Sequence, residues 1–290
     1  MADGNGPRVA GARGVFSKII PAVVLLALSI CGEAGAAPAG ERDVLIALHD
    51  GLIWTDVDCG GRVLHFVVDT GAASSCVNLA AAGRLGLRLG SALNVAGVGG
   101  GTVGYRCRDF DASIGRMPLP REVVALDLSG PARGCSQAID GLIGADFFRG
   151  KVMRIDYHRG LLTRENEPPT GEGIALRIEN GVICVPVAVN GGAPRWTRLD
   201  TGCTDTLYWC EGADCRRNGG AKSVALAWLT GKAIRVEVRV GGADLANLPV
   251  KIRAREIFPG EAGLLGNGAL SRYRVTIDGI GDRLLLEPGA

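Results

Sequence analysis

The residues with the clearest chemical potential occur in two copies of an Asp-Thr-Gly triplet, each at the end of a run that contains apolar residues. A single triplet of this kind is more typical of a turn after a strand, because Asp and Gly are ordinary turn residues. Two carboxylates held close together could instead share one proton, since like charges in contact do not both ionise easily. Such a pair could activate a water molecule and supply a proton during a hydrolysis. The two triplets are Asp69-Thr70-Gly71 and Asp200-Thr201-Gly202.

The surroundings of the two triplets also repeat. A Gly-Gly pair, at 60–61 and at 191–192, precedes each aspartate and predicts a hairpin turn between two strands. Downstream, "DGLIGADFF" (140–148) resembles "AGLLGNGAL" (262–270), where glycines bracket an apolar pair ahead of a short helical stretch. A strand, a turn and a final strand are predicted after each of these. The chain is therefore predicted to carry two copies of one unit, and each copy supplies one aspartate.

The neighbours of each aspartate have physical roles in this hypothesis. Gly71 and Gly202 permit a tight turn with a close approach of the backbone. The hydroxyls of Thr70 and Thr201 can form hydrogen bonds with backbone groups and thereby fix the carboxylates. The two aspartates would titrate as a unit, so the roles of acid and base are not assigned to either one.

Composition limits the class of protein. The chain has 290 residues, of which 47% are hydrophobic and 21% charged, so it can bury a substantial core. Its 45 glycines and many short Val-rich runs favour β structure with many turns. A net charge of +2 argues against nucleic acid as a partner. The three histidines are scattered and no CxxC pair is present, so zinc is disfavoured and no metal or other cofactor is predicted.

Residues 1–36 are predicted to be a secretory signal peptide. Three basic residues precede the apolar run "IIPAVVLLALSIC", which is short for a membrane span, and a small-residue cleavage site ends at Ala36. The protein is then expected to be periplasmic or secreted, without stable membrane association. An uncleaved membrane anchor remains the alternative, and a lipoprotein anchored at Cys31 is disfavoured by the bulky Ile30 before it.

Cysteine usage agrees with export. Nine cysteines become eight if the chain is cut near Ala36, and an even number in an exported chain suggests disulfide bonds. Cys210 and Cys215 enclose only four residues and are predicted to form a short bridged loop. The other pairings cannot be deduced from the sequence.

Together, "VVDTGA" with "DGLIGADFF" and "RLDTGC" with "AGLLGNGAL" give the sequence a resemblance to aspartic proteases of the pepsin/retropepsin kind. The resemblance covers nearly the whole exported portion. The "DTGA" motif and the small unit are similar to bacterial retropepsin-like proteins, and two units in one chain resemble the two-lobed plan of pepsin. This implies a mostly-β, two-lobed fold of two retropepsin-like β-barrel units, the first repeat (42–165) and the second repeat (174–288), joined by a linker (166–173). A monomer with a cleft between the lobes is expected.

The resemblance also implies roles for individual residues. Asp69 and Asp200 would be catalytic, and a glycine-tipped hairpin at 95–105 would close over the cleft. In that hairpin Gly99, Gly100 and Gly101 would form the mobile tip and Tyr105 would line the cleft. In the second repeat the comparable segment is 226–236, with Gly231 at its turn. Trp228 in this segment could line the cleft or pack in the core, and the core is slightly favoured.

One departure from the family pattern is Cys203, where a small residue usually follows the second triplet. Its thiol could pack quietly or form a disulfide that constrains the loop. Cys184 and Cys203 both lack a counterpart in the first repeat, where Ile53 and Ala72 stand, and this weakly suggests that they pair.

The function predicted on this basis is an aspartic endopeptidase, in which the Asp69/Asp200 dyad activates a water that hydrolyses a polypeptide substrate. A non-catalytic protein of the same fold that binds peptides or a partner is the alternative. A glycosidase with two carboxylates is disfavoured, because its acids share no duplicated loop. The other recurrent acids are predicted to be turn, capping or strand-end groups; they are Asp140, Asp146, Asp156 and Asp278.

Overall fold

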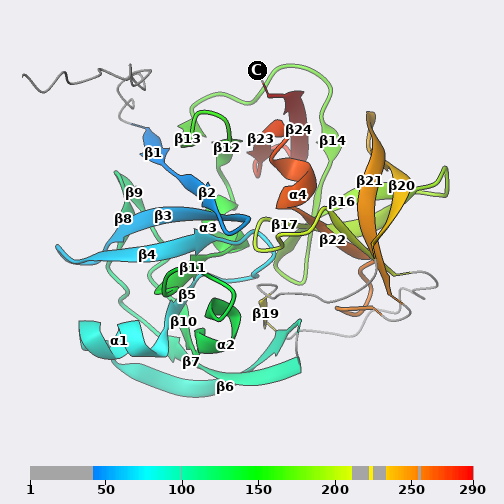
Figure 1. Ribbon diagram of the computed structural model, residues 1–290. Coiled ribbons are helices and arrows are strands. Elements are labelled where there is room, and N and C mark those ends of the chain that lie inside the picture. Colours follow the sequence, from blue (N-terminus) through cyan, green and yellow to red (C-terminus); the bar gives the residue numbers. More distant parts are fainter. Residues whose placement is uncertain (1–41, 99, 211–221, 225–232, 254–255, 290) are drawn as a thin grey trace, which may run out of the picture. The chain divides into compact units, whose positions relative to one another are not determined.

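The computed structural model describes residues 42–98, 100–210, 222–224, 233–253 and 256–289, and in them the fold is mostly β (Figure 1). This confirms the predicted fold class. The predicted signal peptide lies outside the described residues. Within the described part of the chain, the helices are all too short or too polar to cross a membrane.

Three sheets hold the strands of the described residues. The first sheet has the order β19-β6-β7-β10-β5-β11-β4-β3-β8-β9, and β2 pairs with β3 at its side. Apart from β19, all of its strands come from the first repeat. They are β2 (Ala47–His49), β3 (Leu52–Asp58), β4 (Val63–Val68), β5 (Cys76–Asn78), β6 (Leu89–Gly97), β7 (Gly100–Cys107), β8 (Ser113–Ile114), β9 (Met117–Pro118), β10 (Val123–Leu126), β11 (Gly141–Ile143) and β19 (Lys222–Val224).

The second sheet comes from the second repeat and has the order β15-β16-β17-β22-β18-β21-β20. An additional pairing of β16 with β20 closes it into a ring. Its strands are β15 (Arg177–Glu179), β16 (Val182–Val189), β17 (Arg195–Asp200), β18 (Leu207–Cys210), β20 (Ala233–Val240), β21 (Ala243–Arg253) and β22 (Gly263–Gly266).

The third sheet combines strands of both repeats in the order β1-β13-β12-β23-β24-β14. At its centre β12 and β23 pair in antiparallel fashion, with Ile155 opposite Val275. Its strands are β1 (Asp43–Leu45), β12 (Val152–Asp156), β13 (Leu161–Glu165), β14 (Ile174–Ala175), β23 (Tyr273–Asp278) and β24 (Arg283–Pro288). Residues 166–173, the predicted linker, contain neither helix nor strand.

Four short helices accompany the sheets in the described residues. Helix α1 begins where the Asn78 side chain accepts a hydrogen bond from the amide of Ala80, and it ends at Gly86 in the left-handed conformation. The helices are α1 (Leu79–Leu85), α2 (Ser129–Ala132), α3 (Ala145–Phe148) and α4 (Asn267–Leu270). As predicted, α3 and α4 directly follow the two apolar elements bracketed by glycines.

The pairing of strands reproduces the repeat seen in the sequence. The hairpins β3–β4 and β16–β17 turn at the two Gly-Gly pairs, where Gly60, Gly61 and Gly191 have positive φ angles. Each then pairs in parallel with the strand of the apolar element, so that Val67 stands opposite Leu142 and Arg198 opposite Leu264. The orders β4-β11-β5-β10-β7 and β17-β22-β18-β21-β20 match in direction as well. Val67 and Arg198 are therefore equivalent positions.

The glycines of the apolar elements allow close packing of neighbouring strands. A Cβ atom on Gly263 would lie 1.8 Å from the carbonyl oxygen of Tyr208, and one on Gly141 would lie 2.3 Å from the Phe66 ring. Neither contact can be relieved without movement of a buried strand or ring. The elements therefore need glycine at these positions.

We expect Gly263→Ala to lower the free energy of unfolding by more than about 2 kcal/mol, because the new methyl group overpacks a strand pair. Urea denaturation followed by circular dichroism measures the change. The control is Gly130→Ala in α2, where no heavy atom lies within 4 Å of the added Cβ. The control should unfold at the wild-type midpoint or slightly above it. Equal midpoints for the two variants would contradict the packing argument.

Candidate active site

The two aspartates stand at the ends of equivalent strands. Asp69 directly follows β4, and its amide donates a hydrogen bond to the carbonyl of Ile143 at 2.9 Å, which continues the pairing with β11. Asp200 is the last residue of β17 and stands opposite Gly266 of β22. Both side chains are fully buried, with 0% of their surface exposed. The fold thus carries both carboxylates into the interior at the same point of each repeat.

Reciprocal hydrogen bonds connect the two triplets through their threonines. The Thr70 hydroxyl donates to the carbonyl of Leu199 at 2.7 Å and accepts from the amide of Thr201 at 3.1 Å. The Thr201 hydroxyl donates to the carbonyl of Val68 at 2.7 Å and accepts from the amide of Thr70 at 3.0 Å. Each hydroxyl therefore binds backbone of the opposite loop, and the two loops hold each other in place.

We expect Thr70→Val and Thr201→Val each to lower the free energy of unfolding by about 1–3 kcal/mol, since each leaves a buried carbonyl and a buried amide without their partners. Urea denaturation is the measurement. Thr→Ser at the same positions keeps the hydroxyl and serves as the control, and it should lose much less stability. If the Val and Ser variants were equally stable, the cross-loop hydrogen bonds would not hold the loops together.

One glycine contacts both carboxylates. The amide of Gly202 donates to Oδ1 of Asp200 at 2.9 Å, and a Cβ atom on Gly202 would lie 2.5 Å from the carboxyl carbon of Asp69. Oδ1 of Asp69 accepts a hydrogen bond from the amide of Ala72 at 3.1 Å. Among the described residues, no protein donor reaches Oδ2 of either aspartate, and a side-chain hydrogen bond between the two carboxyl groups affects the pKa of each. The loops therefore fix one oxygen of each carboxylate and leave the other available for a proton.

The environment of the pair favours protonation. Burial raises the pKa of Asp69, and the positive charge of Arg198 and the amides of the loop oppose that rise. Burial raises the pKa of Asp200 well above its ordinary value, the charge of Asp69 raises it further, and Arg198 again opposes the rise. Two buried carboxylates that interact in this way are suited to retain one proton between them.

Two residues that contact the loops were not predicted from the sequence. Arg198, two residues before Asp200, is buried and donates a hydrogen bond to the carbonyl of Gly71 at 2.8 Å. Asn267 donates to the carbonyl of Thr201 at 2.7 Å and to that of Gly51 at 2.9 Å. For Arg198, the available signal was a charged residue within a strand expected to be buried. For Asn267, it was the replacement of an alanine, Ala145 in the first repeat, by asparagine at the start of the second short helix.

Cys203 packs as an apolar residue. It lies in a cluster with Tyr208, Phe258 and Leu264, whereas Cys184 packs with Ala73 and Val182 in a different cluster. The suggested Cys184–Cys203 disulfide is therefore wrong. The Cys203 thiol instead packs in the core without forming a bond to Cys184, which is the other alternative considered above. Burial and the charge of Asp200 raise the pKa of this thiol well above its ordinary value.

The more general prediction of disulfides is not supported in the described residues. None of five cysteines there forms a disulfide with another described residue; they are Cys59, Cys107, Cys135, Cys184 and Cys203. Buried apolar surroundings raise the pKa of Cys59 to about 11, in keeping with a thiol that serves as a small core residue. The predicted loop between Cys210 and Cys215 cannot be followed, because Cys215 lies outside the described residues.

The predicted hairpin of the first repeat is present as β6–β7, with Gly97 opposite Gly100 at its tip. Ala96 and Val98 pack against the cluster that contains Cys203, while Val95 belongs to the cluster that contains Ala72. Cys203 and Ala72 each directly follow an Asp-Thr-Gly triplet. The hairpin tip therefore packs beside both loops.

The other residues assigned to the two hairpins have different outcomes. Gly100 and Gly101 lie in β7, where they are exposed near the turn. Tyr105 is half-buried and packs against the main hydrophobic cluster. Gly99, Trp228 and Gly231 lie outside the described residues.

The remaining recurrent acids have partners of their own. Asp140 pairs with Arg84 and accepts from the amide of His65. Asp146 accepts from Ser75, and Asp156 from the amide of Arg159. Asp278 accepts from the amides at 280 and 281 and pairs with Arg283. The local contacts of Asp156 and Asp278 agree with their predicted roles at turns and strand ends, whereas Asp140 and Asp146 join segments that are distant in the sequence. No group of acidic, histidine or cysteine side chains suited to a metal ion occurs within the described ranges.

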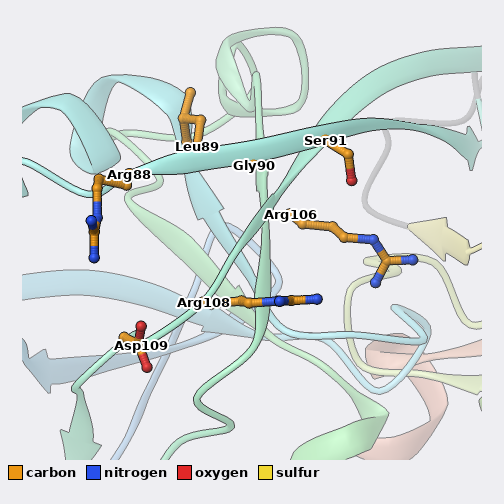
Figure 2. A pocket seen from close by; sticks show the side chains of 7 residues that line it. All are labelled: Arg88, Leu89, Gly90, Ser91, Arg106, Arg108 and Asp109. Atoms are coloured by element: carbon orange, nitrogen blue, oxygen red, sulfur yellow. The ribbon is translucent and has the colours of Figure 1, made fainter.

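A cavity of about 370 Å³ lies at the start of β6 and the end of β7, where the register between these strands shifts (Figure 2). Three arginines line it, at positions 88, 106 and 108, together with Asp109. Arg106 is already paired with Glu122. None of the lining residues belongs to the Asp-Thr-Gly loops, so the cavity is a separate surface feature.

Residues 55–147 match the sequence model of a family described as aspartyl protease. The matched region runs from within β3 to within α3 and includes the first Asp-Thr-Gly loop and the β6–β7 hairpin. A search of curated proteins finds no match to this chain. The family match agrees with the resemblance noted in the sequence and supports a hydrolase of the protease class.

Proposed function

We propose that the protein is an aspartic endopeptidase whose dyad is Asp69 and Asp200. The observation that carries the proposal is the pair of buried Asp-Thr-Gly loops, whose threonines bind each other's backbone and whose carboxylates meet at Gly202. A structural turn would not require two acids to be buried beside each other, because burial of a charge is costly.

In this proposal the ionised aspartate takes a proton from a water molecule, which attacks the carbonyl carbon of the scissile peptide bond. The protonated aspartate donates its proton toward the carbonyl oxygen, so that charge does not build up there. In the breakdown of the resulting tetrahedral diol, the C–N bond breaks. The aspartate that took the proton from water gives it to the leaving amine, and the other aspartate takes a proton from a hydroxyl of the diol as the new carboxyl group forms. The dyad ends the cycle with one proton, as it began.

Access to the dyad would depend on the β6–β7 hairpin. Asp69 and Asp200 have no exposed surface, and the tip residues Ala96 and Val98 pack beside the second loop. Movement of this tip would admit a polypeptide and then exclude water around it. The two-lobed organisation, with boundaries at 42–165 and 174–288, belongs to the same proposal, as does a monomer that needs no cofactor. Export after removal of residues 1–36, and the absence of nucleic-acid or membrane partners, are likewise proposed.

A peptide-library cleavage assay on residues 37–290 between pH 3 and pH 8 tests the function. Wild-type protein should cleave internal peptide bonds, and Asp69→Asn should not. Asp156→Asn, which alters a strand-end acid, is the matched control and should cleave as the wild type does. A wild type that cleaves no peptide, or an Asp69→Asn variant with full activity, would refute the proposal and favour a peptide-binding protein of the same fold.

A further inference from the structure

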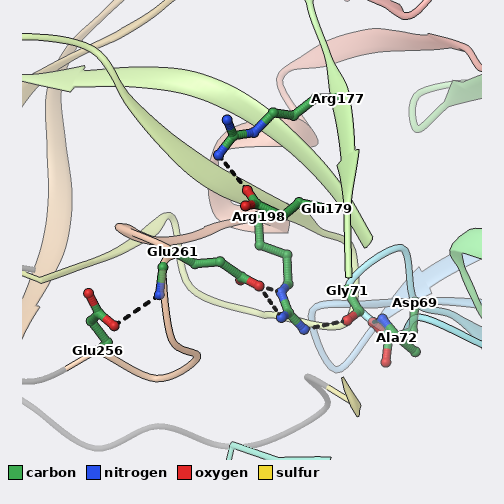
Figure 3. A network of polar contacts seen from close by, with 9 residues as sticks. Asp69, Gly71, Ala72, Arg177, Glu179, Arg198, Glu256 and Glu261 are labelled. Carbon is green, nitrogen blue, oxygen red and sulfur yellow. Dashed lines mark hydrogen bonds and ion pairs between the residues drawn. The ribbon is translucent and has the colours of Figure 1, made fainter. Parts of the chain in front are cut away.

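A fully buried ion pair lies beside the two loops. Arg198 and Glu261 expose only 1% and 2% of their side chains and make a two-pronged contact, with Nε of Arg198 2.6 Å from Oε2 of Glu261. The guanidinium also lies 3.6 Å from the centre of the Phe258 ring. Figure 3 shows Arg198 reaching from Glu261 toward Gly71 and Asp69.

The first repeat has an apolar pair at the equivalent positions. The strand register equates Arg198 with Val67, and Glu261 precedes Gly263 by two residues as Ile139 precedes Gly141. Val67 and Ile139 are both buried in one apolar cluster. Well-packed hydrophobic residues are often as stabilising as a buried ion pair or more so. Stability alone therefore gives no reason for charges at these two positions in the second repeat.

The contact of Arg198 with the first loop has a chemical consequence. Its Nη1 donates to the carbonyl oxygen of Gly71, and the amide of Ala72 donates to Oδ1 of Asp69. This carbonyl and this amide belong to the same peptide unit. A positive charge on the carbonyl side polarises that unit and strengthens the hydrogen bond on its amide side. Arg198 thus acts on Asp69 through one peptide of the opposite repeat.

Other charged groups near the loops are paired among themselves. Arg177 and Glu179 of β15 form a pair that, like Arg198 and Glu261, lies near Cys184. Asp205 pairs with Lys251 near Cys203, and Asp146 of α3 binds Ser75. By contrast, Arg198 acts on both aspartates of the dyad and opposes the rise that burial causes in the pKa of each.

We infer that Arg198, held by Glu261, is a positioning residue that orients the Asp69 carboxylate through the Gly71–Ala72 peptide and sets the pH range in which the dyad holds one proton. This inference rests on the proposed endopeptidase function. It explains why the second repeat has an ion pair where the first repeat has Val67 and Ile139, because a single arginine in one repeat is enough to act on both loops. The substrate-facing chemistry remains with the two aspartates.

The test replaces the ion pair by the residues that the first repeat carries, in the variant R198V/E261I. Its pH–activity profile should move upward by about one unit on both limbs. The guanidinium that favours ionisation of both aspartates has been removed, whereas Glu261, removed with it, lies on the side of that guanidinium away from Asp69 (Figure 3). R198K keeps the positive charge without the two-pronged geometry. The two limbs of its pH–activity profile should therefore lie close to the wild-type positions, while its kcat should be lower than that of the wild type. The exposed cross-strand pair gives the matched control R274V/E287I, which should keep the wild-type profile.

A second readout separates this inference from the function on which it rests. The ¹³C chemical shifts of labelled aspartate carboxyls, followed against pH, report the titration of the dyad without any substrate. The expected result is an upward displacement of the dyad titration in R198V/E261I. Unchanged limbs and an unchanged carboxyl titration in that variant would overturn the inference. A wild type that cleaves nothing would refute the endopeptidase, and the carboxyl titration would still decide the role of Arg198.

Discussion

The Asp200→Asn variant is expected to lose the proposed cleavage activity by about 10²–10⁴-fold, because in the proposed mechanism it removes a proton-transfer group. At neutral pH it is also expected to be more stable than the wild-type protein. Burial and the charge of Asp69 raise the pKa of Asp200 in the folded state. Above the ordinary pKa of an aspartate, the folded protein therefore binds more protons than the unfolded chain, and stability falls as the pH rises.

Asparagine does not titrate, so the variant lacks this loss of stability. The gain should be present at pH 7, where the raised pKa of Asp200 makes its ionisation in the folded state unfavourable. At pH 3 the aspartate is protonated in both states and the gain should disappear. Thermal denaturation at the two pH values measures it. Asp127→Asn is the control and should lower stability at pH 7. The amide of Ser129 lowers the pKa of Asp127, so the ionised Asp127 stabilises the folded state. A gain of equal size at both pH values would contradict the electrostatic explanation.

The Arg198→Met variant is expected to lose about 3–5 kcal/mol of unfolding free energy, because it leaves the Glu261 carboxylate buried without its partner. R198V/E261I removes both charges and should recover most of that loss, since Val67 and Ile139 show that an apolar pair fits the equivalent site. Urea denaturation of the single and double variants gives the coupling between the two positions. A double variant as unstable as the single one would mean that the pair is needed for packing.

The repeat and the strands around the two triplets could be predicted because their signals are local. The Gly-Gly turns, the apolar runs and the two bracketing glycines specify each hairpin without reference to distant residues. The same holds for Asp156 and Asp278, whose partners lie within a few residues in the sequence. The residue types predicted that the Thr70 and Thr201 hydroxyls bind backbone groups, but only the structure shows that each binds the backbone of the opposite loop.

The Arg198–Glu261 pair could not be predicted, because its two members are 63 residues apart and each alone is typical of an exposed position. The prediction of a Cys184–Cys203 disulfide failed for a related reason. It rested on the absence of a counterpart for either cysteine in the first repeat, whereas the packing of Cys184 and Cys203 into separate apolar clusters depends on the tertiary fold. Contacts between residues that are distant in the chain leave no periodic pattern in the sequence from which they could be predicted.

The third sheet bears on what half of this chain could do by itself. Because β12 pairs with β23 along its whole length, either repeat produced separately would present an open strand edge. That edge already fits a strand of the same kind, since both strands occupy equivalent places in their repeats. Two copies of the first repeat could therefore associate through β12 and bring two Asp69 residues into one site. In such a half-length chain, a pair of aspartates would form only on association of two identical copies.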